Sequence, residues 1–206
     1  MIEQTAVARK GSRPRRGTRV SPAGWLAGAR VCASPNHDAR PDPADISLLV
    51  IHNISLPPGR FGGPYIDQLF CNTLDHDAHP FFATLRGLRV SAHALIRRDG
   101  GLTQYVPFTA RAWHAGVSTY EGRERCNDFS IGVELEGTDA QPFTAKQYQR
   151  LLVLTRSLLA SYPRLSAQRI VGHSDIAPGR KTDPGACFDW SRYLGALAMT
   201  PAGERA

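Results

Sequence analysis

The stretch Ser47-Leu48-Leu49-Val50-Ile51-His52 is a nearly continuous apolar run that ends at a histidine. Such a run is typical of a central strand that is buried on both faces, and it places His52 at the carboxyl end of that strand. Residues 53–64 are rich in glycine and proline and predict a loop, which a short helix at residues 65–70 follows. The strand is therefore the expected centre of the fold.

Three further segments have the patterns of strands. The β-prone runs at residues 90–97 and 102–106 flank Arg98-Asp99-Gly100-Gly101, and an Asp-Gly turn between such runs predicts a β-hairpin. Residues 129–136 alternate large apolar side chains with small or acidic ones, which predicts a strand with one packed face.

Helical signals lie between and after these strands. Thr144 is a good N-cap with Gln147 three residues on, and apolar residues follow at helical spacing to about residue 161. A last strand is expected at residues 169–172 and a terminal helix at 188–197. Strands interleaved with helices predict an α/β fold, a single domain with a central mixed β-sheet flanked by helices.

Length and composition agree with one domain, because the chain has 206 residues of which 42% are hydrophobic. No apolar stretch approaches the length of a membrane span, so we expect no membrane association. The cysteines are widely spaced and include no C-x-x-C pair, which favours reduced thiols in a cytosolic protein. They are Cys32, Cys71, Cys126 and Cys187.

The N-terminus is strongly basic and accounts for most of the net charge of +7. Its basic residues are Arg9, Lys10, Arg13, Arg15, Arg16 and Arg19, against the single acidic residue Glu3. The segment that follows is interrupted by Pro22, Gly24 and Gly28 and lacks the apolar core of an export signal. We expect a flexible basic arm at residues 1–22, a catalytic domain at 23–198 and a tail at 199–206. Nucleic-acid binding by the arm is a weaker alternative, and none is expected elsewhere.

The segment from His173 to Asp183 combines an imidazole, carboxylates, an ammonium group and a loop shaped by proline and glycine. With His52 it offers two imidazoles and one carboxylate, a set that suits a catalytic zinc with a fourth position for water. Spacing alone leaves this open, because the chain has seven histidines and no H-E-x-x-H motif. We expect structural or solvated roles for the histidines in polar loops, His37, His76 and His79, while His93 and His114 are candidates for lining a site without touching metal.

Two further residues are candidates for catalysis. Glu134 shares the polar face of its strand with Glu136, and a carboxylate on such a strand indicates a general base or an ion pair with a nearby arginine. Lys181 is placed to stabilise an oxyanion, unless it is an ordinary surface lysine.

The chain resembles the AmpD-type 1,6-anhydro-N-acetylmuramoyl-L-alanine amidases of the zinc amidase and peptidoglycan-recognition superfamily. The resemblance covers about residues 23–195 and is carried by short motifs. They are Gly24-Trp25-Leu26-Ala27-Gly28-Ala29-Arg30, Ser34-Pro35-Asn36, residues 50–59, Val90-Ser91-Ala92-His93, Arg111-Ala112-Trp113-His114-Ala115-Gly116, residues 122–137 and the loop from His173 to Asp183.

The resemblance implies that one Zn²⁺ is bound by His52, His173 and Asp183, with Glu134 as the base and Lys181 as the oxyanion partner. It also implies substrate contacts by Asn53, Arg89, Trp113 and Arg125, where arginines suit carboxylates and the indole offers an apolar face. Some relatives use a cysteine as third ligand, and Cys187 is the nearby rival to Asp183.

The implied reaction is hydrolysis of the amide between the lactyl group of N-acetylmuramic acid and L-alanine in 1,6-anhydro-muropeptides. The implied setting is peptidoglycan recycling in a bacterial cytoplasm, by a monomer, with a possible influence on β-lactamase induction. A peptidoglycan-binding module without catalysis is the alternative, and the presence of all three ligands argues against it.

Overall fold

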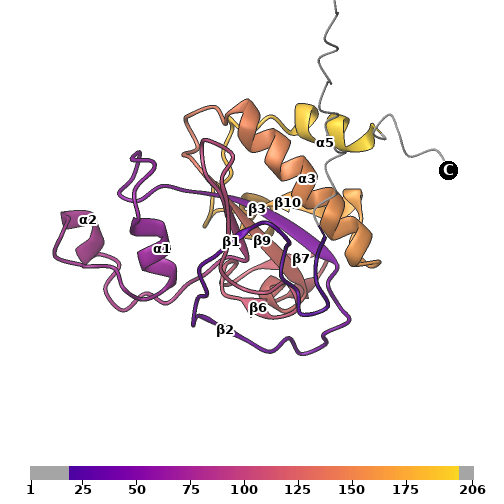
Figure 1. Cartoon of the computed structure of the whole chain (residues 1–206), viewed down its shortest axis with the longest axis horizontal. Coiled ribbons are helices and arrows are strands. Elements are labelled where there is room, and N and C mark those ends of the chain that lie inside the picture. Colours follow the sequence, from indigo (N-terminus) through magenta and orange to yellow (C-terminus); the bar gives the residue numbers. More distant parts are fainter. Residues whose placement is uncertain (1–18, 200–206) are drawn as a thin grey trace, which may run out of the picture.

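The computed structural model describes residues 19–199. Its centre is a six-stranded sheet in the order β1-β5-β4-β9-β3-β10, in which β4 and β5 are antiparallel and the other pairs are parallel (Figure 1). The strands are β1 (Arg30–Val31), β5 (Leu102–Gln104), β4 (Ala94–Ile96), β9 (Ser130–Glu136), β3 (Leu48–Ile54) and β10 (Ile170–Gly172). The predicted mixed sheet is confirmed.

Small elements surround this sheet (Figure 1). Two short antiparallel pairs join β2 (His37–Asp38) to β6 (Arg111–Ala112) and β7 (Thr119–Tyr120) to β8 (Arg123–Glu124). The helices are α1 (Tyr65–Phe70), α2 (Pro80–Ala83), α3 (Ala145–Ser161), α4 (His173–Ile176) and α5 (Trp190–Ala198), with 3-10 turns η1 (Cys126–Asp128) and η2 (Ala167–Arg169).

Strand β3 lies inside the sheet, between β9 and β10, and its apolar run is buried on both faces, as expected from the sequence. Leu49 and Ile51 face the main core with α3 and α5, whereas Leu48 and Val50 contribute to a smaller cluster on the opposite face. All four side chains have no exposed surface. His52 follows on the face of the smaller cluster, away from the long helix.

The prediction of one packed face for the strand at residues 129–136 was wrong. Strand β9 is buried along its whole length, because it lies between β3 and β4 and both faces are covered. Its apolar residues face α3, and on the other face Gly132 makes room for a histidine ring. A Cβ at Gly132 would lie 2.4 Å from Cγ of His114.

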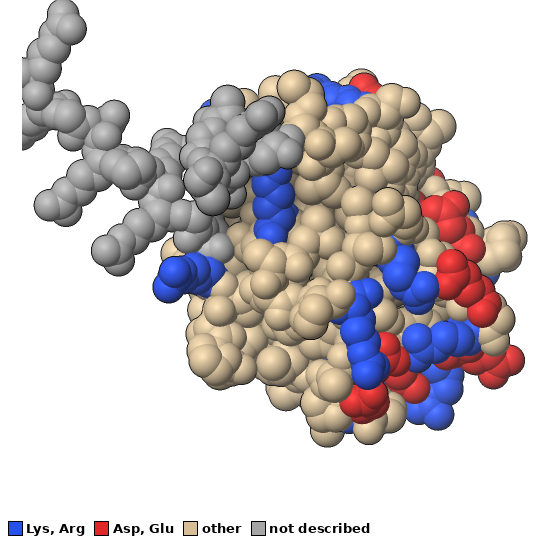
Figure 2. Space-filling view, turned by 90° about the vertical axis from the view of Figure 1, so that its right-hand side faces the viewer, with Lys and Arg blue, Asp and Glu red and all other residues tan. Residues whose placement is uncertain are grey.

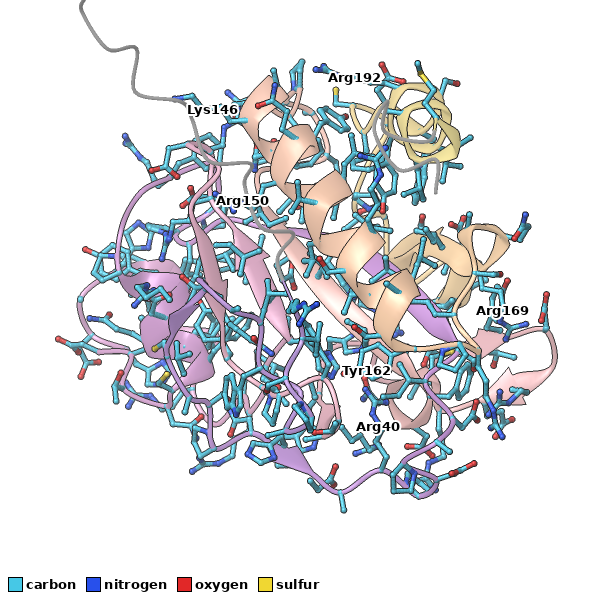
Figure 3. The ribbon with its side chains drawn as sticks, turned by 45° about the vertical axis from the view of Figure 1, so that its right-hand side comes forward. Arg40, Lys146, Arg150, Tyr162, Arg169 and Arg192 are labelled. Carbon is cyan, nitrogen blue, oxygen red and sulfur yellow. The ribbon has the colours of Figure 1, made fainter. Side chains whose placement is uncertain are left out.

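Helix α3 begins where the sequence predicts, at a complete capping box. Thr144 Oγ1 accepts the Gln147 N–H at 3.1 Å, and Gln147 Oε1 accepts the Thr144 N–H at 3.0 Å. The helix runs across one face of the sheet to Tyr162, near the buried Arg40 (Figure 3). The predicted hairpin is also confirmed, and its strands β4 and β5 are shorter than expected. The terminal helix α5 starts at Trp190, two residues later than expected.

The predicted arm lies mostly outside the described residues, which begin at Arg19. Val20 forms an isolated bridge with Leu26, and the Ala27 N–H donates to Arg19 O. The boundary at residue 22 stays a prediction, as does the tail at 199–206. On the face drawn in Figure 2, basic side chains lie apart from one another or beside acidic ones.

Two other expectations concern cysteines and membranes. Cys32 Sγ and Cys71 Sγ, which are 39 residues apart in sequence, lie 3.2 Å from one another as free thiols. Burial raises the pKa of the Cys71 thiol to about 12.

Within residues 19–199, none of the helices combines the length and apolar character that a bilayer crossing requires.

Candidate metal centre and active site

The two histidine ligands predicted from the sequence come from neighbouring parallel strands. Ile51 of β3 pairs with Gly172 of β10, and the residues that follow this pair are His52 and His173. Because the carboxyl ends of parallel strands meet at one edge of a sheet, these imidazoles converge. Asp183 reaches the same point from the loop after α4, where the Ser174 N–H donates to its carbonyl oxygen.

The three side chains form a compact donor set. His52 Nδ1 lies 3.0 Å from both His173 Nδ1 and Asp183 Oδ2, and His173 Nδ1 lies 3.1 Å from Asp183 Oδ2. Ligand atoms around a tetrahedral Zn²⁺ are about 3.3 Å apart, given bonds of about 2.0–2.1 Å. The set His52, His173 and Asp183 therefore fits a metal ion, and the structure brings together all three predicted ligands.

Hydrogen bonds behind the histidines orient the ligand atoms. His173 Nε2 lies 3.1 Å from the carbonyl oxygen of Ala115, which must accept the ring proton, so Nδ1 keeps its lone pair for the site. His52 Nε2 lies 2.9 Å from His114 Nδ1, and His114 Nε2 lies 3.0 Å from Ser130 Oγ. This chain of contacts leaves His52 Nδ1 facing the other ligands, as metal-binding histidines require.

The protonation states also suit a cation. Burial lowers the pKa of His52 to about 4, although the hydrogen bond to Asp183 opposes this shift. Burial acts to raise the pKa of Asp183, but the hydrogen bonds with His173 and His52 hold it well below its ordinary value. A neutral imidazole and an ionised carboxylate are the forms that bind metal.

Glu134 lies beside this donor set without a hydrogen-bond partner for its buried Oε2 among the described residues. It pairs in register with His52 across β9 and β3, and 9% of its surface is exposed. Burial and the negative charge of Asp183 raise the pKa of Glu134 well above its usual range. A buried carboxyl group with a raised pKa beside a candidate metal site is a candidate for accepting and returning a proton.

The ion-pair alternative for Glu134 is realised instead at Glu136. Arg97 Nη1 donates to Glu136 Oε1 at 3.0 Å, and the N–H groups of Gly62 and Arg98 donate to the same carboxylate. The two acids share a face of β9, but only Glu134 lies at the metal site. The sequence pattern could not separate them, because their environments come from different loops.

The site opens into a cleft of about 480 Å³. Its lining includes the three candidate ligands together with Asn53, Arg89, Trp113, His114, Asn127, Glu134, Arg180 and Lys181. A second, more open depression of about 620 Å³ shares Asn53, Lys181 and Asp183 with this cleft.

Three of the four residues predicted to contact substrate line the cleft. Arg89 is exposed, and within residues 19–199 its guanidinium has no hydrogen-bond or ion-pair partner. Trp113 is half-buried, and its Nε1 is buried without a partner among these residues. Asn53 uses its amide nitrogen to donate to Asp139 Oδ1 and to Pro184 O. Lys181 is exposed at the junction of the two depressions.

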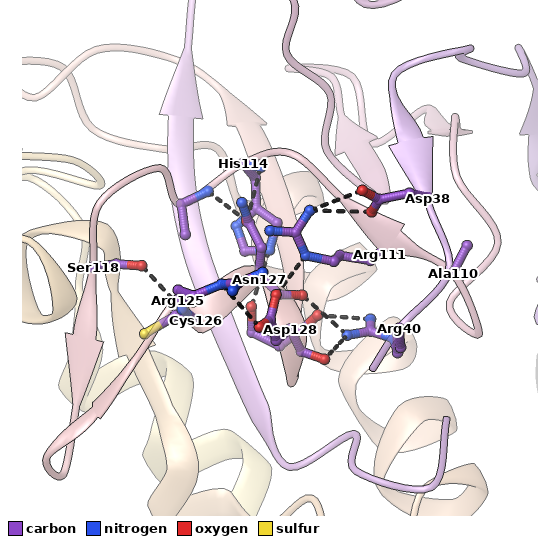
Figure 4. Close-up of polar contacts among 12 residues, drawn as sticks. Asp38, Arg40, Ala110, Arg111, His114, Ser118, Arg125, Cys126, Asn127 and Asp128 are labelled. Atoms are coloured by element: carbon purple, nitrogen blue, oxygen red, sulfur yellow. Dashed lines mark hydrogen bonds and ion pairs between the residues drawn. The ribbon is translucent and has the colours of Figure 1, made fainter. Parts of the chain in front are cut away.

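Arg125 is the predicted substrate residue that the structure does not bring into the cleft. It has a left-handed backbone with φ of 61°, and its Nε lies 3.2 Å from Asp128 Oδ2 (Figure 4). Asp128 in turn accepts from Arg111 Nε at 2.5 Å. The guanidinium of Arg125 is therefore occupied by a local ion pair.

His114 lines the cleft as expected, without belonging to the ligand set, whereas His93 lies beneath it. His93 Nδ1 accepts the Gly132 N–H at 3.0 Å, which supports the strand that carries Glu134. Burial holds the pKa of both His93 and His114 well below the ordinary value. Both rings are therefore neutral parts of the framework.

Two buried framework residues were not identified from the sequence. Asn127 Oδ1 accepts the N–H groups of His114 and Ala115, and thereby holds the segment that supports both metal-site histidines (Figure 4). Arg40 donates to the carbonyl oxygens of Phe108, Asn127, Asp128 and Ser130, and burial lowers its pKa to about 10. Neither residue has a local sequence signal, because each acts on backbone from distant segments.

Comparisons with known proteins show which family the chain resembles. The chain is 63% identical over 181 residues to the 1,6-anhydro-N-acetylmuramyl-L-alanine amidase AmpD of Salmonella typhimurium strain SL1344, covering 88% of this chain and 96% of that protein. It is similar to a crystal structure of a selenomethionine AmpD derivative, with a TM-score of 0.83, 62% identity, and coverage of 86% of this chain and 98% of that one.

A more distant match contains a substrate. It is the N-acetylmuramyl-L-alanine amidase AmiD from E. coli in complex with anhydro-N-acetylmuramic acid-L-Ala-D-gamma-Glu-L-Lys, with a TM-score of 0.54 and 32% identity. That match covers 88% of this chain and 65% of the other. The family model described as N-acetylmuramoyl-L-alanine amidase matches residues 42–186, and the chain belongs to this amidase family.

Proposed function

We propose that the protein is a zinc-dependent amidase that hydrolyses the bond between the lactyl group of 1,6-anhydro-N-acetylmuramic acid and L-alanine. The main support for the proposal is the convergence of His52, His173 and Asp183 in one cleft with Glu134, whose buried Oε2 has no hydrogen-bond partner among the described residues. The substrate class is supported by the names of the relatives that match at about 60% identity, with the 63% match as the example.

The residues His52, His173 and Asp183 would hold one Zn²⁺, which when bound supplies a Lewis acid that polarises the scissile carbonyl and acidifies water. Glu134 takes a proton from the attacking water. It then delivers this proton to the amine of L-alanine as the carbon–nitrogen bond breaks. Burial and the negative charge of Asp183 raise its pKa, which favours the protonated form that the second step needs.

Lys181 is the proposed partner of the oxyanion. Its ammonium group lies on the loop that also carries Asp183, and Lys181 lines both depressions. The neighbouring cation, Arg180, donates instead to the carbonyl oxygens of Ala115 and Val117. A positive charge at this point would stabilise the negative charge that develops on the carbonyl oxygen. Its exposure leaves it free to move toward a bound substrate.

The cleft offers complementary groups for the rest of the substrate. Arg89 is available for a stem-peptide carboxylate, and Trp113 offers an apolar face to the sugar or peptide. Asn53 lines both depressions and would contact the substrate near the cleaved bond. A contact by Arg125 stays a prediction from the family resemblance and would require its ion pair with Asp128 to open.

The biological setting is part of the same proposal. Hydrolysis of anhydro-muropeptides belongs to peptidoglycan recycling, and we propose that it takes place in the cytoplasm, with the monomer as the active species. An influence on β-lactamase induction would depend on a responding circuit in the host.

The test combines metal analysis with product analysis. The purified protein is expected to hold about one zinc per chain and to release free peptide and an anhydro-muramyl saccharide from an anhydro-muropeptide, as followed by mass spectrometry. Removal of the metal with a chelator should stop release, and zinc should restore it. Tight binding without peptide release would contradict the proposal and favour a binding module, and hydrolysis that survives metal removal would exclude zinc dependence.

A further inference from the structure

Asp139 connects two segments of the site although it is neither a candidate ligand nor a candidate base. It lies in the turn between β9 and α3. Its Oδ1 accepts from Asn53 Nδ2 at 2.6 Å, and its Oδ2 accepts from Thr182 Oγ1 at 2.5 Å. Over residues 19–199 no lysine or arginine forms an ion pair with it, so both oxygens are committed to these two donors.

The two donors are sequence neighbours of the metal ligands. Asn53 directly follows His52, and Thr182 directly precedes Asp183. The second N–H of the Asn53 amide donates to Pro184 O at 3.0 Å. The residues on both sides of Asp183 are therefore held, Thr182 by Asp139 in the turn after β9 and Pro184 by Asn53 of β3.

The backbones of the Asp139 turn and the Asp183 loop also lie in close contact. Gly185 has φ of +81°, and a Cβ there would lie 2.2 Å from Cα of Asp139. The Cys187 N–H donates to Asp139 O at 3.3 Å. The turn that carries Asp139 and the end of the Asp183 loop thus touch without space for a side chain between them.

These bonds also determine which atom of Asn53 is free. Both N–H groups of the amide are used, one by Asp139 and one by Pro184, so the nitrogen cannot turn into the cleft without losing two hydrogen bonds. The group that Asn53 presents to the cleft is its Oδ1, an acceptor. The matching substrate group is a donor, such as an amide N–H.

We propose that Asp139 is a positioning residue, which holds the carboxylate of Asp183 at the metal site and orients Asn53 as a hydrogen-bond acceptor for a substrate N–H. The part that concerns the substrate rests on the proposed amidase function. The part that concerns the metal does not. Residues that support metal ligands from behind contribute about 10–100-fold to metal affinity or activity.

The first test measures metal binding in Asp139→Ala by competition with a chelator. We expect zinc affinity to fall about 10–100-fold, and the visible absorption bands of the Co²⁺ form to change because the Asp183 ligand moves. The matched control is Asp77→Ala, since Asp77 is highly exposed and pairs only with Arg86 among the described residues. A variant that loses thermal stability but keeps the affinity and the Co²⁺ spectrum would overturn the proposal.

Asp139→Asn separates hydrogen bonding from charge. Its carbonyl oxygen can still accept from Asn53, and its amide can donate to Thr182 Oγ1 in place of accepting from it. We therefore expect this variant to retain most of the zinc affinity that Asp139→Ala loses. Equal losses in both variants would assign the effect to negative charge and contradict positioning by these bonds.

The kinetic test uses an anhydro-muropeptide. In zinc-saturated enzyme, Asp139→Ala should raise KM more than it lowers kcat, because saturation restores the metal while Asn53 remains free to rotate. A KM equal to that of the wild type under these conditions would contradict the role in orienting Asn53. If the wild type itself releases no peptide, the amidase proposal fails, while the chelator and Co²⁺ measurements still decide the role of Asp139 at the metal.

Discussion

His52 and Glu134 are register partners on the adjacent parallel strands β3 and β9, so their side chains project from the same face of the sheet. This relationship places a candidate metal ligand beside a carboxyl group whose buried Oε2 has no hydrogen-bond partner within residues 19–199. Both positions are supported by backbone hydrogen bonds rather than by loops.

Replacement of Glu134 by glutamine should abolish turnover without removing zinc. The amide keeps the shape of the side chain but cannot accept the proton of the attacking water, and general-base catalysis contributes about 10²–10⁴-fold. Steady-state hydrolysis and bound zinc should be measured on the same preparation. The exposed Glu124→Gln serves as control, and substantial activity in Glu134→Gln would exclude this residue as the base.

Removal of the ring behind His52 should weaken metal binding. In His114→Ala the bond from His52 Nε2 to His114 Nδ1 is lost, so the His52 ring is free to turn. We expect a fall of about 10–100-fold in zinc affinity, measured by chelator competition. His37→Ala, at an exposed position on β2, should bind zinc as the wild type does. Unchanged affinity in His114→Ala would show that the ligand set needs no support from this ring.

The two arginines predicted to contact substrate should differ in effect. Arg89 lines the cleft and is unpaired among the described residues, whereas Arg125 pairs with Asp128 outside it. Hydrogen bonds to charged groups contribute about 1.5–3 kcal/mol, so Arg89→Ala should lower kcat/KM by roughly 10–100-fold. Arg125→Ala should have a smaller effect. The reverse order would mean that the substrate opens the Arg125 ion pair.

Stability of the metal-free protein should fall in mild acid. Burial lowers the pKa of His52 to about 4 and that of His93 well below its ordinary value of about 6.5. The unfolded chain therefore binds protons more readily, and stability present above pH 6.5 is lost as the pH falls toward 4. Chemical denaturation between pH 4 and pH 8 measures the slope. His93→Asn, which cannot titrate, should make this slope shallower, and an unchanged slope would contradict the assignment.

Loss of the α3 cap should cost about 1 kcal/mol of unfolding free energy. Thr144→Ala removes the acceptor of the Gln147 N–H and the donor to Arg98 O. Ser166→Ala is the matched control, because Ser166 precedes η2 without a side-chain capping bond. Urea denaturation compares the two variants, and equal stability would mean that the packing of α3 alone holds its first turn.

Local patterns in the sequence predicted elements that depend on nearby residues. The apolar run before His52, the Asp-Gly turn at Asp99 and the capping box at Thr144 all correspond to elements of the structure. These signals are short-range, because a strand, a hairpin turn and a helix start are each specified within a few residues. The candidate ligands were also chosen from the sequence, by residue type and by family resemblance.

Only the tertiary structure decided how these residues act together. The pairing of β3 with β10 brings His52 next to His173. Arg97 forms an ion pair with Glu136, whereas Glu134 forms none among the described residues. The tertiary structure also placed Asp139 against the Asp183 loop, across 43 residues of sequence from Thr182. Burial and long-range hydrogen bonds arise only when the chain packs. The two partners of such a bond are far apart in sequence, so no local pattern can predict it. The sequence by itself thus determined the elements and the residue types of the site, while packing determined which carboxyl group is left free for chemistry.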